Sequence, residues 1–141
     1  MCIRDRVRHE GFVATLGRDV PTAVVPAPSS LALGRRALVE LLEKDPGLQA
    51  VCCSSDTLAQ GVMVEALARG MRVPQDLAIC GFGDAEFAAH TVPSISTVHV
   101  DGPGIGRLAA QIIVSRSRGE QVAQTVHDLG FRLIERQSTG G

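Results

Sequence analysis

Two spacings of apolar residues divide this chain into helices and strands. Apolar positions that recur every three or four residues predict amphipathic helices at 8–16, 31–44, 56–69 and 102–118. Continuous apolar runs favour strands buried on both faces of a parallel sheet at 48–53 and 77–80. Shorter β-branched or alternating stretches predict further strands at 22–25, 95–100, 125–129 and 131–135, and a short helix is expected within 85–90.

The unit formed by strand 48–53, the helix after it and strand 77–80 organises the chain. Two buried strands joined by one helix imply a right-handed parallel crossover. The first strand ends in Ser54, Ser55 and Asp56, of which Ser55 or Asp56 is expected to cap the helix, and the second runs into Gly83 and Asp84. Small ligands bind at the carboxyl edge of open α/β sheets, so these side chains are candidates for ligand contact.

Composition narrows the class of protein. A chain of 141 residues can form one domain with a core, and its net charge of −1, with dispersed arginines, argues against a nucleic-acid surface in these residues. No apolar run is long enough for a membrane span, and the start of the chain lacks a signal-peptide pattern. Residues 1–6 precede a helix already in progress, so we expect a non-native start and a fragment of a longer protein.

The cysteines do not indicate a metal site. Cys2, Cys52, Cys53 and Cys80 include no C-x-x-C spacing, and adjacent Cys52 and Cys53 point to opposite faces of a strand. Small buried apolar residues in a reducing cytoplasm explain them best. No metal and no cofactor are expected.

The sequence motifs give little support for nucleotide binding or for catalysis. The glycines at 102–106 follow a strand and open a helix, but their spacing is not G-x-G-x-x-G and Pro103 removes a donor, which favours a tight turn. The sequence has no G-x-S-x-G elbow. A grouping of Ser55, His90 and Asp84 can be imagined, but spacing alone lends it no geometry.

Taken together, the motifs resemble the LacI/GalR family of bacterial transcription regulators. The ordered set covers essentially everything after Arg6. Its stretches are Arg8-His9-Glu10-Gly11-Phe12, Ser54-Ser55-Asp56-Thr57-Leu58-Ala59-Gln60-Gly61, Gly70-Met71-Arg72-Val73-Pro74-Gln75-Asp76, Ile79-Cys80-Gly81-Phe82-Gly83-Asp84, Pro93-Ser94-Ile95-Ser96-Thr97-Val98 and Arg136-Gln137-Ser138.

The resemblance implies an α/β fold of the periplasmic-binding-protein-like (type I) class, in which a parallel sheet is flanked by helices. Residues 7–141 would be part of an effector-binding domain, mainly its C-terminal lobe, with 95–118 crossing to the other lobe. The helix-turn-helix domain would be absent. The whole protein would be a cytoplasmic homodimeric repressor that reaches operator DNA only through that missing domain, and this chain alone should neither bind operator DNA nor hold a ligand tightly.

The resemblance also suggests ligand contacts. Arg8 matches an arginine that contacts the effector in many members, and Ser55 sits where an effector-binding asparagine is common. Gly83 replaces an aspartate that binds sugar hydroxyls in most members, and Asp84 would line the same side of the cleft. Loss of that carboxylate disfavours neutral sugars and removes a charge that would repel an anion. The resulting hypothesis is an effector such as gluconate or another sugar acid, bound partly by Arg8.

Two other classes stay open at this point. A sugar-binding protein of a transport system would share the fold and need a secretion signal. An α/β enzyme fragment would predict turnover or nucleotide binding, for which no motif was found.

Overall fold

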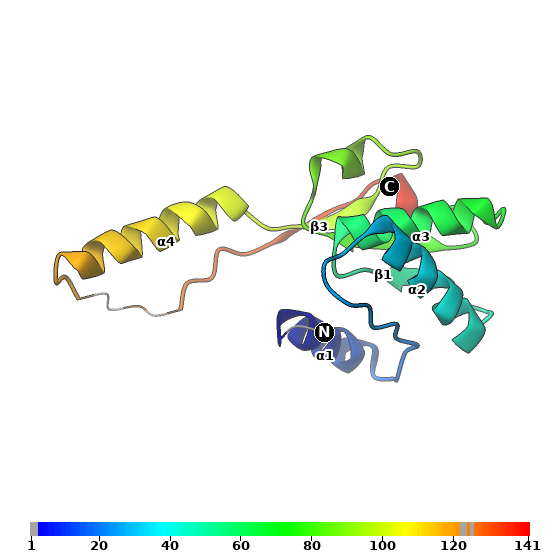
Figure 1. The fold of residues 1–141 in the computed structure, drawn as a ribbon, viewed down its shortest axis with the longest axis horizontal. Coiled ribbons are helices and arrows are strands. Elements are labelled where there is room, and N and C mark those ends of the chain that lie inside the picture. The colour runs from blue at the N-terminus through cyan, green and yellow to red at the C-terminus, as the bar shows by residue number, and fades with distance from the viewer. Residues whose placement is uncertain (1–2, 122–123, 125) are drawn as a thin grey trace.

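The computed structural model describes residues 3–121, 124 and 126–141, which form a sheet with helices on both faces and one projecting arm (Figure 1). The strands lie in chain order as β1 (Ala50–Cys52), β2 (Ala78–Phe82), β3 (Ser96–His99) and β4 (Arg132–Ile134). β1, β2 and β3 are parallel, and β4 is antiparallel to β3. The predicted α/β class with a mainly parallel sheet is confirmed.

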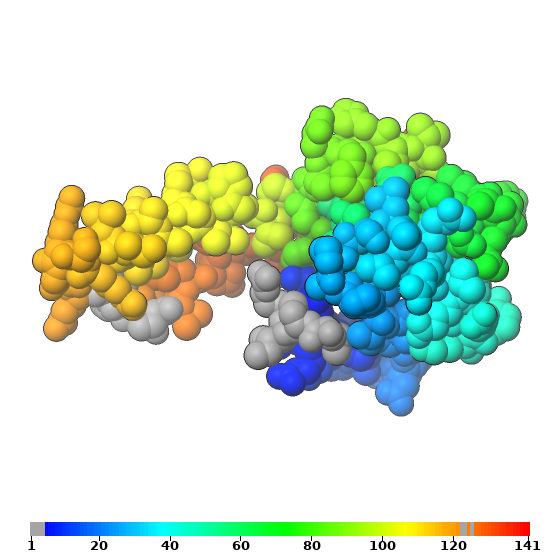
Figure 2. Space-filling view, in the orientation of Figure 1, coloured from blue at the N-terminus to red at the C-terminus, as the bar shows by residue number. Residues whose placement is uncertain are grey.

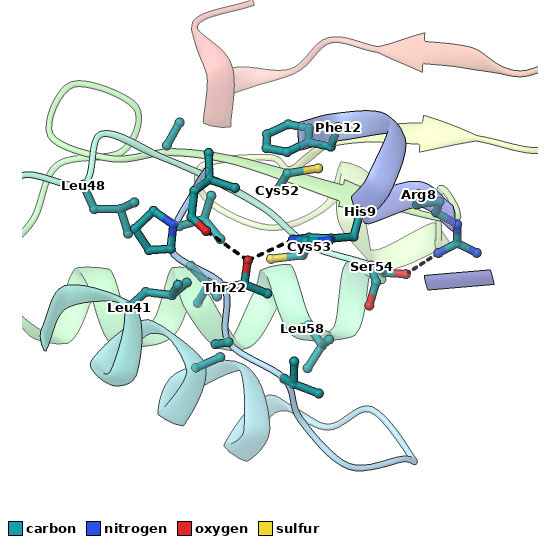
Figure 3. A pocket seen from close by; sticks show the side chains of 18 of the residues that line it. Arg8, His9, Phe12, Thr22, Leu41, Leu48, Cys52, Cys53, Ser54 and Leu58 are labelled. Carbon is teal, nitrogen blue, oxygen red and sulfur yellow. Dashed lines mark hydrogen bonds between the residues drawn. The ribbon is translucent and has the colours of Figure 1, made fainter. Parts of the chain in front are cut away.

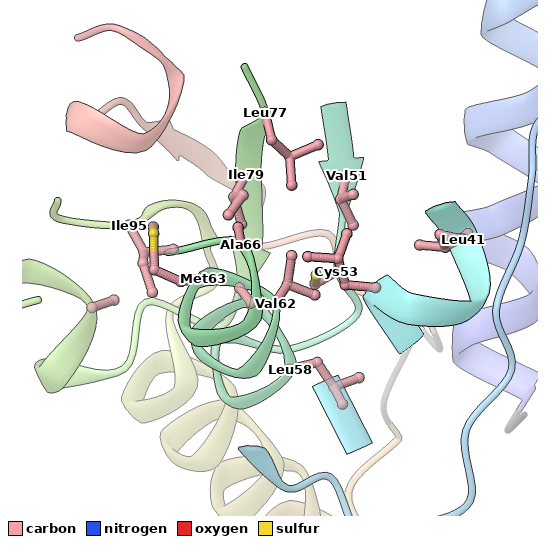
Figure 4. Close-up of a cluster of buried hydrophobic side chains, with 13 residues drawn as sticks. Leu41, Val51, Cys53, Leu58, Val62, Met63, Ala66, Leu77, Ile79 and Ile95 are labelled. Carbon is pink, nitrogen blue, oxygen red and sulfur yellow. The ribbon is translucent and has the colours of Figure 1, made fainter. Parts of the chain in front are cut away.

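The core lies between the sheet and the helices α2 (Leu31–Lys44) and α3 (Asp56–Ala68) (Figure 4). α3 follows β1 and leads to β2, as the crossover predicted. The two helices approach so closely that a Cβ at Gly61 would meet the carbonyl oxygen of Leu31, which explains the glycine at that position. The fully buried side chains include Leu38, Val62, Met63, Leu77, Ile79 and Ile95.

Helix ends follow the expected chemistry. The Ser30 hydroxyl accepts from the Leu33 N–H at 3.2 Å and starts α2. Gly70, with φ of +76°, follows the last turn of α3 in the left-handed region that favours glycine. The short helix expected within 85–90 is the 3₁₀ helix η1 (Glu86–Ala89), and a second 3₁₀ helix, η2 (Gln137–Thr139), lies near the chain end.

The opposite face of the sheet carries α1 (Ile3–Leu16), which begins five residues before the predicted start. β1 is an edge strand whose Ala50 and Cys52 are exposed, while Val51 is buried against α3. The prediction that this strand is buried on both faces was therefore wrong. α1 stands off from β1, so only the α3 face of the strand is covered.

The arm consists of α4 (Gly102–Ser117) and the segment that returns from it to β4 (Figures 1 and 2). In both views it extends away from the body of the molecule. Its apolar side chains are open to solvent, with Ile105 49% and Ile113 67% exposed. Such exposure is unusual for large apolar side chains of a helix and leaves one face of α4 without a packing partner among the described residues.

Two predicted strands did not form. Residues 22–25 run as an irregular segment, because the carbonyl oxygen of Thr22 accepts from Lys44 Nζ at 2.7 Å and its hydroxyl pairs with His9 Nε2 at 3.0 Å. Thr22 thus contacts α1 and α2 instead of a neighbouring strand. Of the other segment, Thr125 lies outside the described residues and 126–129 adopts no regular structure. Among the described residues no helix combines the length and apolar character of a membrane span.

Candidate functional site

The predicted contact residues gather at the carboxyl edge of the sheet. Ser55 follows β1 and caps α3, where its hydroxyl oxygen accepts from the Leu58 N–H at 3.3 Å. Gly83 and Asp84 follow β2. A serine hydroxyl that accepts one bond keeps a proton to donate, so capping leaves Ser55 able to bind a ligand.

Arg8 reaches this edge from α1. Its Nη1 donates to the Ser54 carbonyl oxygen at 3.3 Å and to Asp5 Oδ1 at 3.2 Å, and its guanidinium lies 3.9 Å from the centre of the Phe82 ring. The face of an aromatic ring attracts a cation and orients the planar guanidinium. Ser54 and Phe82 are the chain neighbours of Ser55 and Gly83, so the fold brings three of the four predicted residues to one place.

Asp84 has a different environment from the other three. Its Oδ1 accepts from Arg136 Nη2 at 2.7 Å, and its Oδ2 lies 2.9 Å from His99 Nδ1. The hydrogen bond from Arg136 holds the pKa of the Asp84 carboxyl below its usual value of 3.8. Asp84 therefore links the strand ends to the C-terminal segment, and each oxygen keeps one lone pair for a further donor.

The backbone here is unusual. Gly83 has φ of +121° and Asp84 has φ of +55°, both in the left-handed range. Contacts of Asp84 stabilise this conformation, because its backbone N–H donates to Thr97 Oγ1 at 3.3 Å. The turn is thus held by side chains from β3 as well as by the β2 strand itself.

Asp56 contributes more than the sequence indicated. It is 2% exposed, and its two oxygens accept from Thr97 Oγ1 and from the Ala85 N–H, both at 2.6 Å. A Cβ at Gly81 would overlap Asp56 Oδ1. The sequence made Asp56 a candidate for the helix cap and for ligand contact. In the structure Ser55 caps the helix, and the Asp56 carboxylate binds Thr97 and Ala85. No local pattern in the sequence marks this role, because its partners Ala85 and Thr97 lie 29 and 41 residues away.

The Arg136-Gln137-Ser138 motif joins the chain end to the sheet. Ser138 is fully buried, accepts from the Ser96 N–H at 2.8 Å and donates to the Ile79 carbonyl oxygen at 2.5 Å. Arg136 is fixed by Asp84 and by the Ile95 carbonyl oxygen at 2.9 Å. The sequence showed this motif only as part of a resemblance. Its partners are more than 40 residues away, where local patterns carry no signal.

A cavity of about 610 Å³ lies between α1 and the open face of the sheet (Figure 3). Of the four predicted contact residues only Arg8 lines it, together with Phe12, Cys52 and Phe82. The cavity adjoins the carboxyl edge through Arg8 and Ser54. It extends around β1, because the irregular segment that contains Thr22 leaves that edge without a neighbouring strand.

The glycine-rich turn at 102–106 is a helix start. Asp101 caps α4, and its Oδ1 accepts from the Gly104 N–H at 2.8 Å. The expected tight turn is confirmed, and a carboxylate occupies the helix N-terminus where a phosphate would bind in a dinucleotide loop.

Comparison with known proteins agrees with this architecture. A family model described as a periplasmic binding protein-like domain matches residues 3–139. The HTH-type transcriptional regulator GntR of Pseudomonas aeruginosa is 38% identical over 144 residues, which cover 96% of this chain and 41% of the relative. The chain thus spans about two fifths of that curated relative's length.

Solved structures give the same result. Transcription regulator GntR from Chromobacterium violaceum superposes with a TM-score of 0.92 at 35% identity, over 100% of this chain and 54% of that one. The transcriptional regulator CelR in complex with cellobiose superposes with a TM-score of 0.81 at 28% identity, over 92% of this chain and 40% of that one.

Proposed function

Because the chain belongs to the periplasmic-binding-protein-like domains of LacI/GalR-family transcription regulators, we propose that it is the ligand-sensing part of a repressor. Its relatives are regulators rather than enzymes, which favours sensing over turnover. In this proposal a sugar or sugar acid binds at the carboxyl edge of the sheet, with Arg8, Ser55, Gly83 and Asp84 as contacts.

Other parts of the proposal concern the whole protein. The exposed apolar side chains of α4 support a role for residues 95–118 in crossing to a second lobe, which would cover them. The HTH-type names of the relatives support operator binding through a separate N-terminal domain, and with it a homodimer that works in the cytoplasm. Closure of two lobes on a ligand would then shift the dimer between DNA-binding states.

One observation supports an anionic ligand such as gluconate. Arg8 is oriented by the Phe82 ring, the Ser54 carbonyl oxygen and Asp5 Oδ1, and the residue that follows Phe82 is a glycine, Gly83, which contributes no carboxylate. A guanidinium held in this way can bind a carboxylate through two parallel hydrogen bonds. A relative named GntR and another named IdnR agree with a sugar-acid regulator.

The proposal is tested by NMR titration of the ¹⁵N-labelled chain with potassium gluconate, glucose and potassium chloride. We expect gluconate to bind weakly, at millimolar concentrations, and to shift the amides of Ser55, Gly83 and Asp84. Glucose and chloride should leave them unchanged. Arg8→Met should abolish the gluconate shifts, whereas Arg107→Met, which removes an exposed charge from α4, should not. Equal or tighter binding of glucose would refute the preference for an anion.

A further inference from the structure

Cys52 and Cys80 face each other across two adjacent strands. Cys52 ends β1 and is the register partner of Cys80 in β2, so both side chains leave the sheet on the same face. That face is the one turned toward α1, away from the core formed with α3. Cys53, the next residue along, points the other way and is buried.

The two facing thiols differ in access. Cys52 is exposed and lines the cavity under α1, as its position beside Phe12 shows (Figure 3). Cys80 is half-buried, and its Sγ lies 3.6 Å from the Gly81 carbonyl oxygen. The sequence interpretation of all cysteines as small buried apolar residues is therefore wrong for Cys52 and holds for Cys53.

The more exposed thiol, Cys52, is also the more acidic of the two. The facing Cys80 side chain lowers the pKa of Cys52 to about 7, and the same neighbour relation raises the pKa of Cys80. Burial raises the pKa of Cys53. The lowered pKa favours the thiolate, the reactive form, at Cys52, and the raised pKa favours the protonated thiol at Cys80.

The backbone spacing permits a bond between the pair. Neighbouring strands lie about 4.8 Å apart, and disulfides join Cα atoms separated by about 4.4–6.8 Å. A disulfide also needs Cβ atoms about 3.8 Å apart, so its formation draws the two strands together slightly. A disulfide at an exposed cysteine such as Cys52 is readily reduced, which favours a reversible bond over a permanent one.

We propose that Cys52 and Cys80 are a redox-sensitive thiol pair that closes to a disulfide on oxidation by a peroxide or a low-molecular-weight disulfide. With a glutathione-type disulfide, the Cys52 thiolate attacks one sulfur, forms a mixed disulfide and releases one thiolate, which takes up a proton. Cys80 then gives up its proton and attacks the Cys52 sulfur, releasing the second thiol. Two protein thiols are oxidised and one small disulfide is reduced to two thiols. With hydrogen peroxide the same pair yields a disulfide and two molecules of water, through a Cys52 sulfenic acid.

The disulfide would form close to the residues that hold Arg8, namely Ser54 and Phe82. Phe82 lies two residues beyond Cys80 in β2, so the ring that holds Arg8 shares the face of the thiol pair, and the Ser54 carbonyl oxygen that accepts from Arg8 lies two residues beyond Cys52. The proposal itself does not depend on what Arg8 binds, because it rests only on the thiols and on the sheet.

The test uses the purified chain with Cys2→Ser, which leaves three cysteines. The protein is equilibrated with oxidised and reduced glutathione, quenched with iodoacetamide and digested with trypsin. The sequence places Cys52 and Cys53 on the peptide 45–69 and Cys80 on the peptide 73–107. We expect these peptides to be linked, with a mass lower by two hydrogens than their sum, and to separate after dithiothreitol.

Single substitutions assign the bond. Cys53→Ala is the matched control and should retain the link between the two peptides. Cys80→Ala should stop at glutathione attached to Cys52, and Cys52→Ala should leave Cys80 alkylated rather than oxidised. A glutathione adduct that persists on Cys52 with Cys80 present, a Cys52–Cys53 link, or an unmodified Cys52 would each overturn the proposal.

Discussion

Replacing Asp84 by asparagine should destabilise the fold markedly, because one carboxylate holds two distant segments. Its side chain is 20% exposed and that of Arg136 is 17% exposed, so the pair lies between a surface ion pair and a buried one. Surface pairs contribute about 0–1 kcal/mol, and removal of one partner from a buried pair costs about 3–5 kcal/mol. For Asp84→Asn we expect a loss of about 2 kcal/mol, as for a hydrogen bond between charged groups.

Urea denaturation followed by far-ultraviolet circular dichroism measures this loss, since the sequence has neither Trp nor Tyr for intrinsic fluorescence. A double-mutant cycle with Arg136→Met isolates the pair, and a coupling energy of about 1–2 kcal/mol is expected. Glu40→Gln is the matched control, because Glu40 forms an exposed pair with Lys44 and should cost less than about 0.5 kcal/mol. If Asp84→Asn costs no more than Glu40→Gln, the Asp84 contacts do not stabilise the chain.

The same contact predicts a dependence on pH. The folded-state pKa of Asp84 lies below its usual 3.8, so the folded chain binds this proton less readily than the unfolded chain. The stabilisation is therefore complete above the unfolded pKa and is lost as pH falls through the folded pKa. The difference in unfolding free energy between the wild type and Asp84→Asn should be constant from about pH 5 to 7 and shrink below about pH 4.

Three further substitutions test other contacts. Gly61→Ala forces a Cβ against the Leu31 carbonyl oxygen and should cost about 1–3 kcal/mol in urea unfolding, whereas Gly11→Ala, with open space around it, should be neutral or stabilising. Ser138→Ala leaves a buried donor and a buried acceptor without partners and should cost about 2–4 kcal/mol in the same assay. Gly83→Asp and Gly83→Asn share the same backbone strain at φ of +121°, so a loss of gluconate binding in the NMR titration that is at least about 5-fold larger for aspartate would reflect its charge.

The sequence predicted elements wherever local pattern and burial agree. α2, α3 and the strands β2 and β3 follow from apolar spacing, and their ends follow from Ser30, Ser55 and Gly70. Residues 22–25 had the composition of a strand, but Thr22 is bound instead by His9 of α1 and Lys44 of α2. Cys52 was expected to be buried because its neighbours are apolar, and the edge position that exposes it depends on which strands pair.

The contacts of Asp84 could not be predicted from local pattern either, because they also depend on which strands pair. Arg136 is 52 residues away in sequence, and no periodic pattern pairs the two. The resemblance to regulators drew attention to both residues separately, as a strand-end acid and as a terminal motif. Only the sheet order, with β4 antiparallel to β3, brings the terminal motif back beside the end of β2.

That arrangement gives Asp84 a particular position in the molecule. His99 is the last residue of β3, which leads out to α4, and Arg136 follows β4, by which the chain returns. One carboxylate thus binds both connections of the arm at the point where they leave the body (Figure 1). Asp84 is also the neighbour of Gly83 at the proposed ligand edge. A ligand donor that displaces Arg136 or His99 from one of these oxygens would therefore weaken the hold on one connection of the arm, whereas a donor that uses a free lone pair would leave both contacts in place.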